Sequence, residues 1–414
     1  METSVLIEQL DRWANPNAEP IDSAIRLLEE MSTDHGDGPT EAFHRSSASM
    51  RFERDSAGGA SRCRLGREEG GALRWFDPRD GTLGFAAASG DARHSFDQCR
   101  VIATRIRGKP VERCPWNTDA APVEDLETAA RVPEAEEILD WLRRNTPDSV
   151  DSAWVEIAVT TETWLNSGGN VQKRGRSRVW AAWTPRSEGA KPVFAAARTW
   201  GALSRADRAE AWRDRAPGAG HDFPWPDDAR LVFSPETSAI LAHMLVRTAH
   251  HPFVEPGTPV GPGWVLTADP TNHQAAIFGS SADDAGFSRT TRFLADGRHV
   301  IGSWGGPGTL RRGSFRDPPQ PEPVNLSLEP PKIDPPRRAI WITSIDLHPA
   351  ADGWTVRLQG RRYPDGAPLR PKWTRFHPQL LLKACLGGLG PARESHVGMT
   401  TPALVFEELA SSAS

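Results

Sequence analysis

The chain has 414 residues, a formal net charge of −5 at neutral pH, 25% charged residues and 38% hydrophobic residues. This balance is typical of a soluble globular protein, and the length predicts two or three domains. The negative net charge argues against a nucleic-acid binder that works through a broad basic surface. No stretch approaches the ~20 apolar residues of a membrane span, and the acidic N-terminus does not resemble a signal peptide. We therefore expect a cytoplasmic protein that binds neither nucleic acid nor membrane.

The four cysteines carry no metal or disulfide pattern. They are Cys63, Cys99, Cys114 and Cys385, and no two of them form a CxxC pair. Zinc ribbons and disulfide frameworks need closely paired or regularly spaced cysteines. We expect isolated, reduced thiols.

The first half of the chain mixes predicted helices and strands. Residues 1–31 carry two apolar stripes at helical spacing, and Pro20 lies just ahead of the second. The stripes consist of Leu6, Leu10 and Trp13 and then of Ile25, Leu27, Leu28 and Met31. Residues 46–88 predict short strands with a turn at 77–81. Further along, the patterns predict helices at 91–107, 133–145 and 203–216, and strands at 152–160, 171–184 and 191–200.

A stretch rich in proline and glycine, residues 216–228, predicts a domain boundary, with domains at 1–220 and 221–414. Behind it Ser234, Pro235 and Glu236 have the chemistry of a helix N-terminus, and this helix should extend to about residue 249. Strands are expected at 338–347, 353–362 and 403–409, with a short helix at 379–386. The eight prolines within residues 317–337 predict an extended connector without regular structure.

The predicted fold class is therefore α+β. We expect a mixed N-terminal domain of α/β type, followed by a mainly antiparallel β C-terminal domain with a central helix.

Two charged motifs allow more than one interpretation. The basic run Lys173, Arg174, Arg176 and Arg178 is interpreted as a solvated strand face. Asp283 and Asp284 form either a functional carboxylate pair or the flank of a loop, and we favour the second interpretation.

Several segments, in this order, resemble the TldD/TldE peptidase family. The resemblance rests on weak motifs whose shared order extends over nearly the whole chain. They are Ser46 to Phe52, Gly81 to Ala86, Trp154 to Gly169, Leu231 to Glu236, Leu266 to Pro270, Ser281 to Gly286, Pro323 to Leu326 and Thr401 to Glu407. Ala285 departs from the family pattern, which has a glutamate at that position.

The resemblance implies a heterodimer in which a TldD-type subunit carries an HExxxH helix. Its two histidines and a cysteine hold zinc, its glutamate is the general base, and the TldE-type subunit lacks this site. The pair would degrade unfolded peptides or trim the leaders of peptide natural products. For this chain the resemblance predicts the TldE type, with no catalytic or metal residue of its own and with zinc in the partner.

The residues at the family's metal helix support that prediction. The first ligand position falls at His243, but Met244 and Thr248 occupy the positions of the base and of the second ligand. His250 and His251 lie seven and eight residues further on, roughly 10–12 Å along a helix, too far to share an ion with His243. In the C-terminal region no cysteine stands at residues 394–400, and Cys385 is interpreted as buried packing in a helix.

Two alternatives remain open. His250 and His251 either cap a helix end or form a separate metal or acid/base site with Glu255. The chain is either a non-catalytic peptidase subunit that shapes a peptide chamber, an independent enzyme on the same scaffold, or a peptide-binding adaptor.

Asn166, Ser167, Gly168 and Gly169 have the composition of a hairpin turn. They are also the candidate substrate-binding residues, as a loop that contacts an extended peptide.

Overall fold

The structure is a computed structural model of the whole chain. It describes residues 19–35, 38–55, 62–106, 108–119, 122–126, 133–146, 150–186, 192–205, 223–226, 229–248, 257, 263–272, 280, 283–287, 289, 291–296, 298–299, 310–321, 324–350, 353–363, 365–376, 384–395 and 399–407. Two large sheets organise these residues, and the fold class is α+β, as predicted.

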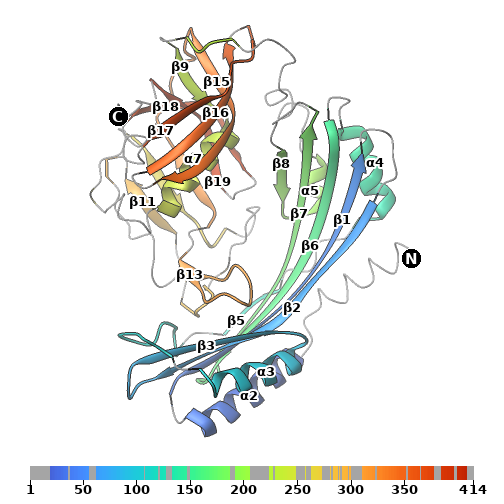
Figure 1. Cartoon of the computed structure of the whole chain (residues 1–414), viewed down its shortest axis with the longest axis vertical. Helices are drawn as coiled ribbons and strands as arrows, with labels where there is room; N and C mark the ends of the chain where they lie inside the picture. The colour runs from blue at the N-terminus through green and yellow to red at the C-terminus, as the bar shows by residue number, and fades with distance from the viewer. Residues whose placement is uncertain are drawn as a thin grey trace.

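The first sheet is long and curved (Figure 1). Within the described part it has eight strands, in the order β4-β3-β2-β1-β6-β7-β5, with β8 beside β7. Neighbours pair antiparallel, except β5 and β7, which are parallel. The strands are β1 (Thr40–Asp55), β2 (Arg62–Asp77), β3 (Thr82–Ser89), β4 (Lys109–Pro110), β5 (Val123–Leu126), β6 (Val150–Asn166), β7 (Val171–Pro185) and β8 (Val193–Ala197).

Helices cover one face of this sheet. Because side chains alternate between the two faces of a strand, the even-numbered residues of β1 share one side. Ala42 packs in a core cluster with α2 (Glu19–His35) and α3 (Ala92–Ala103). Met50 belongs to a second cluster on the same face, with α4 (Ala135–Asn145) and α5 (Trp200–Arg205).

The second sheet lies in the C-terminal half. Nine strands are described in it, in the order β11-β10-β14-β19-β9-β15-β16-β17, with β18 beside β19. Helix α7 (Pro235–Thr248) belongs to this half, and its Ala239, Leu241 and Ala242 lie in the main core cluster. The strands are β9 (Arg230–Phe233), β10 (Val265–Ala268), β11 (Arg292–Asp296), β14 (Leu326–Glu329), β15 (Ala339–Ala350), β16 (Gly353–Tyr363), β17 (Lys372–Phe376), β18 (Cys385–Glu394) and β19 (Met399–Phe406).

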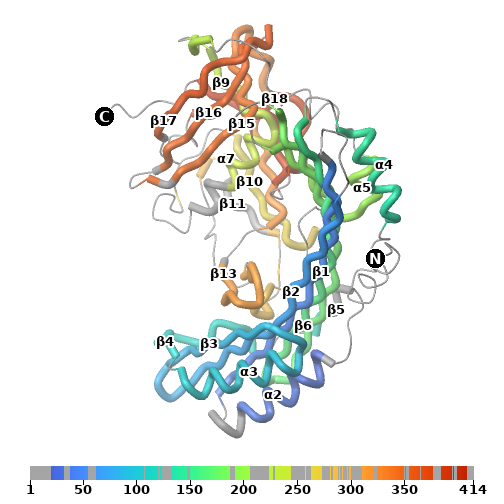
Figure 2. Tube along the Cα trace, turned by 45° about the vertical axis from the view of Figure 1, so that its right-hand side comes forward, coloured from blue at the N-terminus to red at the C-terminus, as the bar shows by residue number. Residues whose placement is uncertain are grey.

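A small strand pair connects the two halves in space. β12 (Leu310–Arg311) and β13 (Gln320–Pro321) form a hairpin that leaves the second sheet and lies against the first (Figures 1 and 2). The turn between them carries Arg312 and Phe315, both fully buried. The C-terminal half therefore reaches the face of the first sheet that the helices leave uncovered.

Several sequence predictions are confirmed. The Asp77 to Gly81 turn is present, Ser234 Oγ accepts the Thr237 N–H at the start of α7, and β15 pairs with β16 as expected. Helix α4 and strand β7 fall within a few residues of their predicted ranges. The stripe at residues 6–13, the helix at 206–216 and the region of His250 lie outside the described residues.

Other predictions are wrong. Residues 46–88 form long strands, because β1 and β2 pair over almost their full 16 residues. Trp200 begins a helix instead of ending a strand. The proline-rich connector contains β14, whose residues pair with β10 and β19 and gain strand structure from these distant partners. Cys385 begins β18 instead of lying in a helix, although its burial is confirmed.

Candidate functional site

Polar residues line the face of the first sheet that is opposite the helices. The strand register places Arg45 of β1 beside Glu162 of β6, and Glu162 beside Arg174 of β7. Glu41 and Arg74 form the next such pair, on β1 and β2. Residues at odd positions of β1 and even positions of β6 and β7 thus build one continuous charged surface.

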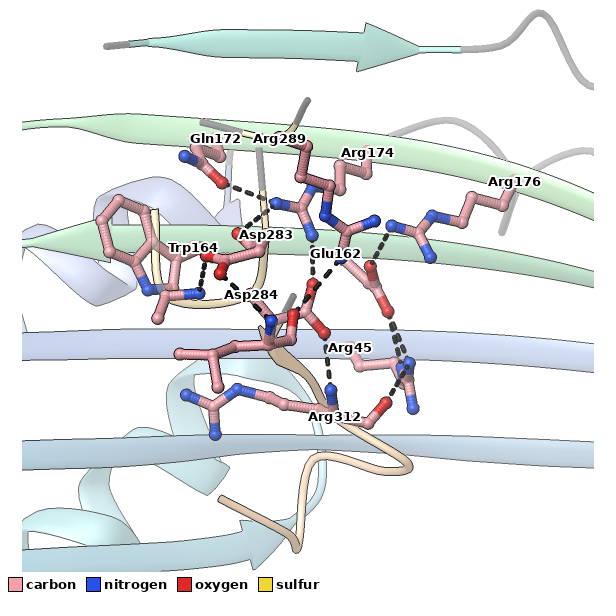
Figure 3. A network of polar contacts seen from close by, with 12 residues as sticks. Arg45, Glu162, Trp164, Gln172, Arg174, Arg176, Asp283, Asp284, Arg289 and Arg312 are labelled. Atoms are coloured by element: carbon pink, nitrogen blue, oxygen red, sulfur yellow. Dashed lines mark hydrogen bonds and ion pairs between the residues drawn. The ribbon is translucent and has the colours of Figure 1, made fainter. Parts of the chain in front are cut away.

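Two described stretches, residues 283–287 with Arg289 and residues 310–317, cover this surface and are called the covering segment below (Figure 3). Asp284 pairs with Arg174 and accepts the backbone N–H of Arg312. The Arg312 guanidinium pairs in turn with Glu41. Arg45 donates to the carbonyl oxygen of Gly313 at 2.7 Å. The two halves of the chain are therefore joined by buried ion pairs and hydrogen bonds.

Apolar contacts accompany the charged ones. Phe315 packs directly over Gly70 of β2, where a Cβ would lie 2.3 Å from the phenyl ring. The Arg312 guanidinium lies 4.7 Å from the centre of the Phe43 ring, and Trp164 donates its Nε1–H to Glu41 at 2.8 Å. Glycine at position 70 is thus required by the close approach of the aromatic ring.

The cluster contains more positive than negative charge. Six arginines in it are buried, Arg45, Arg74, Arg174, Arg176, Arg289 and Arg312. Four buried carboxylates are described in it, Glu41, Glu162, Asp283 and Asp284. The described network therefore holds an excess of two positive charges.

The surrounding charges determine the protonation of the cluster. Burial alone would raise the pKa of Glu162, but Arg176 and Arg45 lower it to about 2. Burial likewise opposes ionisation of Asp284, yet Arg174 and Arg289 hold the pKa of that carboxyl well below its usual range. A general acid or base needs a pKa near the working pH. Glu162 and Asp284 remain ionised at neutral pH, so they suit ion pairing and not proton transfer.

The predicted solvated face at residues 173–178 is wrong for two of its members. Arg174 and Arg176 are buried, 3% and 8% exposed, because the C-terminal segment lies over β7. Both residues interpreted as a loop flank meet this face, Asp284 with its carboxylate and Asp283 with its backbone carbonyl oxygen, which accepts a hydrogen bond from Arg174. The one sequence signal that could have indicated burial is the matching of opposite charges across neighbouring strands, such as Arg45 with Glu162.

The candidate substrate residues form the turn between β6 and β7. Asn166 is buried and donates its side-chain amide to the carbonyl oxygens of Asn117 (3.0 Å) and Thr118 (3.3 Å). Ser167 Oγ accepts the Thr40 N–H at 3.1 Å. Gly168 and Gly169 are exposed, and Gly169 has a positive φ of 79°. The hairpin turn is confirmed, and a role in substrate binding stays a prediction.

The predicted metal-helix position lies on α7. His243 is half-buried there, and the side chains of residues 244–248 lie outside the description. Burial raises the pKa of the Cys385 thiol to about 12, which leaves it protonated. Among the residues that the structure describes, no three His, Cys, Asp or Glu side chains gather to hold a metal ion. No described helix is long and apolar enough to cross a membrane.

Taken together, the chain is a two-sheet α+β protein whose halves meet through a buried charged cluster. Several solved structures share this fold, including the following three. TldE from Thermococcus kodakarensis superposes with a TM-score of 0.64 and 15% identity, over 93% of this chain and 98% of that one. A candidate modulator of a DNA gyrase from Thermotoga maritima gives a TM-score of 0.66 and 12% identity, over 94% and 98%. A similar protein from Bacteroides thetaiotaomicron gives 0.63 and 13%, over 94% and 98%.

The structural similarity covers at least 93% of this chain and 98% of each of the other three, and it is a similarity of fold. No protein-family model and no curated protein matches the sequence.

Proposed function

We propose that this chain is a TldE-type subunit of the TldD/TldE family. It would complete a heterodimeric zinc metallopeptidase whose catalytic metal belongs to a TldD-type partner. The observation that carries the proposal is the fold shared with TldE over 93% of this chain and 98% of that one. The order of the family motifs in the sequence supports the same assignment.

The residues of helix α7 support the proposal that the partner, and not this chain, holds the catalytic zinc. Zinc peptidases hold the ion with two helical ligands one turn apart and activate water with an adjacent carboxylate. In α7 the sequence offers His243 but places Met244 and Thr248 where the base and second ligand would stand. A thioether accepts no proton at neutral pH, so the hydrolytic water would be activated by the partner's zinc and glutamate.

The decisive experiment is coexpression of the full chain with an HExxxH-bearing homologue from the same genome. We expect a stable pair that contains one zinc per complex and hydrolyses unfolded peptide, whereas each subunit alone is inactive. The matched control replaces the glutamate of the partner's HExxxH motif by glutamine, which should preserve the pair and abolish hydrolysis.

Two outcomes would replace the proposal. Turnover by the isolated chain, unaffected by a chelator, would identify an independent enzyme on the same scaffold. Peptide binding without hydrolysis and without any partner would identify an adaptor.

We also propose that the turn at Asn166 to Gly169 contacts the peptide in the assembled pair. A Cβ at Gly169 meets no atom within 4 Å, so a side chain there would extend into open space. Gly169→Asn suits the positive φ and should raise KM without unfolding the chain. Asp151→Asn, on an exposed end of the same strand β6, is the control. An unchanged KM in Gly169→Asn would show that the turn does not contact the peptide.

A further inference from the structure

The buried cluster leaves one arginine without an ionic partner in the described structure. Arg289 is 6% exposed, and its one described hydrogen bond runs from its guanidinium to the Leu310 carbonyl oxygen at 3.3 Å. Its Nε has no hydrogen-bond partner among the described atoms. A buried guanidinium in this state is costly, because its hydration is lost and the nearby charges of Asp284 and Asp283 reach it without a direct ion pair.

The carboxylates of the cluster are already engaged with other groups. Glu41 forms ion pairs with Arg74 and Arg312. Glu162 forms ion pairs with Arg45 and Arg176.

The two aspartates are engaged as well. Asp284 pairs with Arg174, while Asp283 accepts the backbone N–H groups of Ala285, Phe287 and Leu310 at 2.9 to 3.1 Å. No described carboxylate is left to pair with Arg289.

The neighbouring sequence supplies no further acid. Between Pro270 and Arg316 the chain contains three acidic residues, Asp283, Asp284 and Asp296. Asp296 is exposed at the end of β11, where its carboxylate accepts the N–H groups of Arg298 and His299. The covering residues therefore offer Arg289 only the charges of Asp283 and Asp284, and both of these carboxylates are already engaged with other groups.

Arginine retains its charge here. Burial lowers the pKa of Arg289 to about 10, which is still well above neutral pH. Arg174 and Arg176 lie close by and add positive potential (Figure 3). A guanidinium matches an oxyanion with two parallel hydrogen bonds, a geometry suited to carboxylate and phosphate groups.

We propose that a small oxyanion of carboxylate or phosphate type binds at Arg289, beside Arg174 and Arg176. It supplies negative charge between the first sheet and the covering segment, and so stabilises their contact. The source is either a free inorganic anion or the carboxylate at the end of a peptide. This inference does not depend on the peptidase proposal, since the isolated chain must show the binding.

Titration calorimetry on the full chain, at low ionic strength, tests the site with two probes. One is inorganic phosphate, and the other is an acetylated tripeptide with a free C-terminal carboxylate, compared with its C-terminal amide. We expect at least one oxyanion probe to bind with one site per chain. Phosphate binding alone identifies a free anion as the source, whereas binding of the free peptide but not of its amide identifies a peptide end.

The variant Arg289→Gln removes the charge, and we expect it to weaken binding at least ten-fold. Arg298→Gln, at an exposed arginine just after β11, should bind like the wild type. If Arg289→Gln does not fold, Arg289→Lys retains the charge without the planar fork and should still weaken binding several-fold. No saturable binding of either oxyanion to the wild type would overturn the proposal, and so would unchanged affinity in the folded Arg289 variant.

Discussion

The two faces of the first sheet use the same strands and are stabilised in different ways. The face beneath the helices is apolar, with Met50, Val155 and Ile138 of α4 in one core cluster. The opposite face buries ion pairs such as Arg45 with Glu162. Apolar burial stabilises each contact by itself, whereas a buried charge is tolerated only while its partner is present. We therefore expect the two faces to respond differently to the loss of one side chain.

The largest effect should follow from Glu162→Gln on the charged face. This change leaves two buried guanidiniums, Arg45 and Arg176, without their carboxylate, and breaking a buried pair costs about 4 kcal/mol. Urea unfolding measures the loss, and trypsin should cut faster after Arg311 in the covering segment. Asp151→Asn, which removes an exposed carboxylate from the same strand, is expected to change neither. A loss below about 1 kcal/mol in Glu162→Gln would show that the network is not stabilising.

On the helix face, Ile138→Ala should cost about 3 kcal/mol, because it leaves a cavity in a fully buried position. The matched control is Leu139→Ala at the neighbouring, partly buried position, where about 1 kcal/mol is expected. Unlike Glu162→Gln, Ile138→Ala should not accelerate trypsin cleavage after Arg311 under native conditions. Equal acceleration in both variants would show that the two faces do not act separately.

Acid should destabilise the chain through His44, which lies on the helix face of β1. Burial lowers the pKa of His44 to about 4, against an opposing effect of Asp91 and a normal value of 6.5. The unfolded chain thus binds the proton first, and stability falls as the pH drops from 6.5 to 4. Between pH 7 and pH 5 we expect a loss of about 2 kcal/mol from this residue.

Urea unfolding at both pH values measures the loss, and His44→Gln should reduce the difference. An undiminished difference in that variant would exclude His44 as the cause. Glu162 acts in a second pH window, because its folded pKa of about 2 lies below its ordinary value of 4.5. Its contribution is present above pH 4.5 and is lost as the pH falls toward 2.

The contact between the covering segment and the sheet is tested by a steric change. Gly70→Ala places a methyl group 2.3 Å from the Phe315 ring and 2.5 Å from the Ala88 carbonyl oxygen, and it should cost at least about 3 kcal/mol by overpacking. The double variant with Phe315→Leu should lose less than the sum of its two single changes, since the smaller side chain relieves the clash with the ring, although the contact with the Ala88 carbonyl oxygen remains. Gly201→Ala, whose added Cβ has its nearest neighbour at 3.7 Å, should be neutral or slightly stabilising. Additive losses in the double variant would contradict direct contact between Gly70 and Phe315.

Local patterns in the sequence predicted much of the fold. Amphipathic spacing at residues 133–145 and the Ser234 cap predicted helices that the structure contains, since both signals act within one or two turns. Strand lengths were underestimated at β1 and β2, and β14 was missed, because pairing with distant strands extends or creates these elements. The fold class α+β followed from the order of helices and strands alone.

The sequence by itself also determined the alternation of side chains along β1, β6 and β7, and the excess of arginine over acid near Arg289. Only the tertiary structure decided that Arg174 and Arg176 are buried, because the covering carboxylate of Asp284 lies 110 residues away along the chain. From the sequence alone a run of charged residues is expected to be exposed to solvent, although a distant segment can bury it in the folded protein. Local propensity acts over a few residues, whereas burial and ion pairing depend on which segments meet in space.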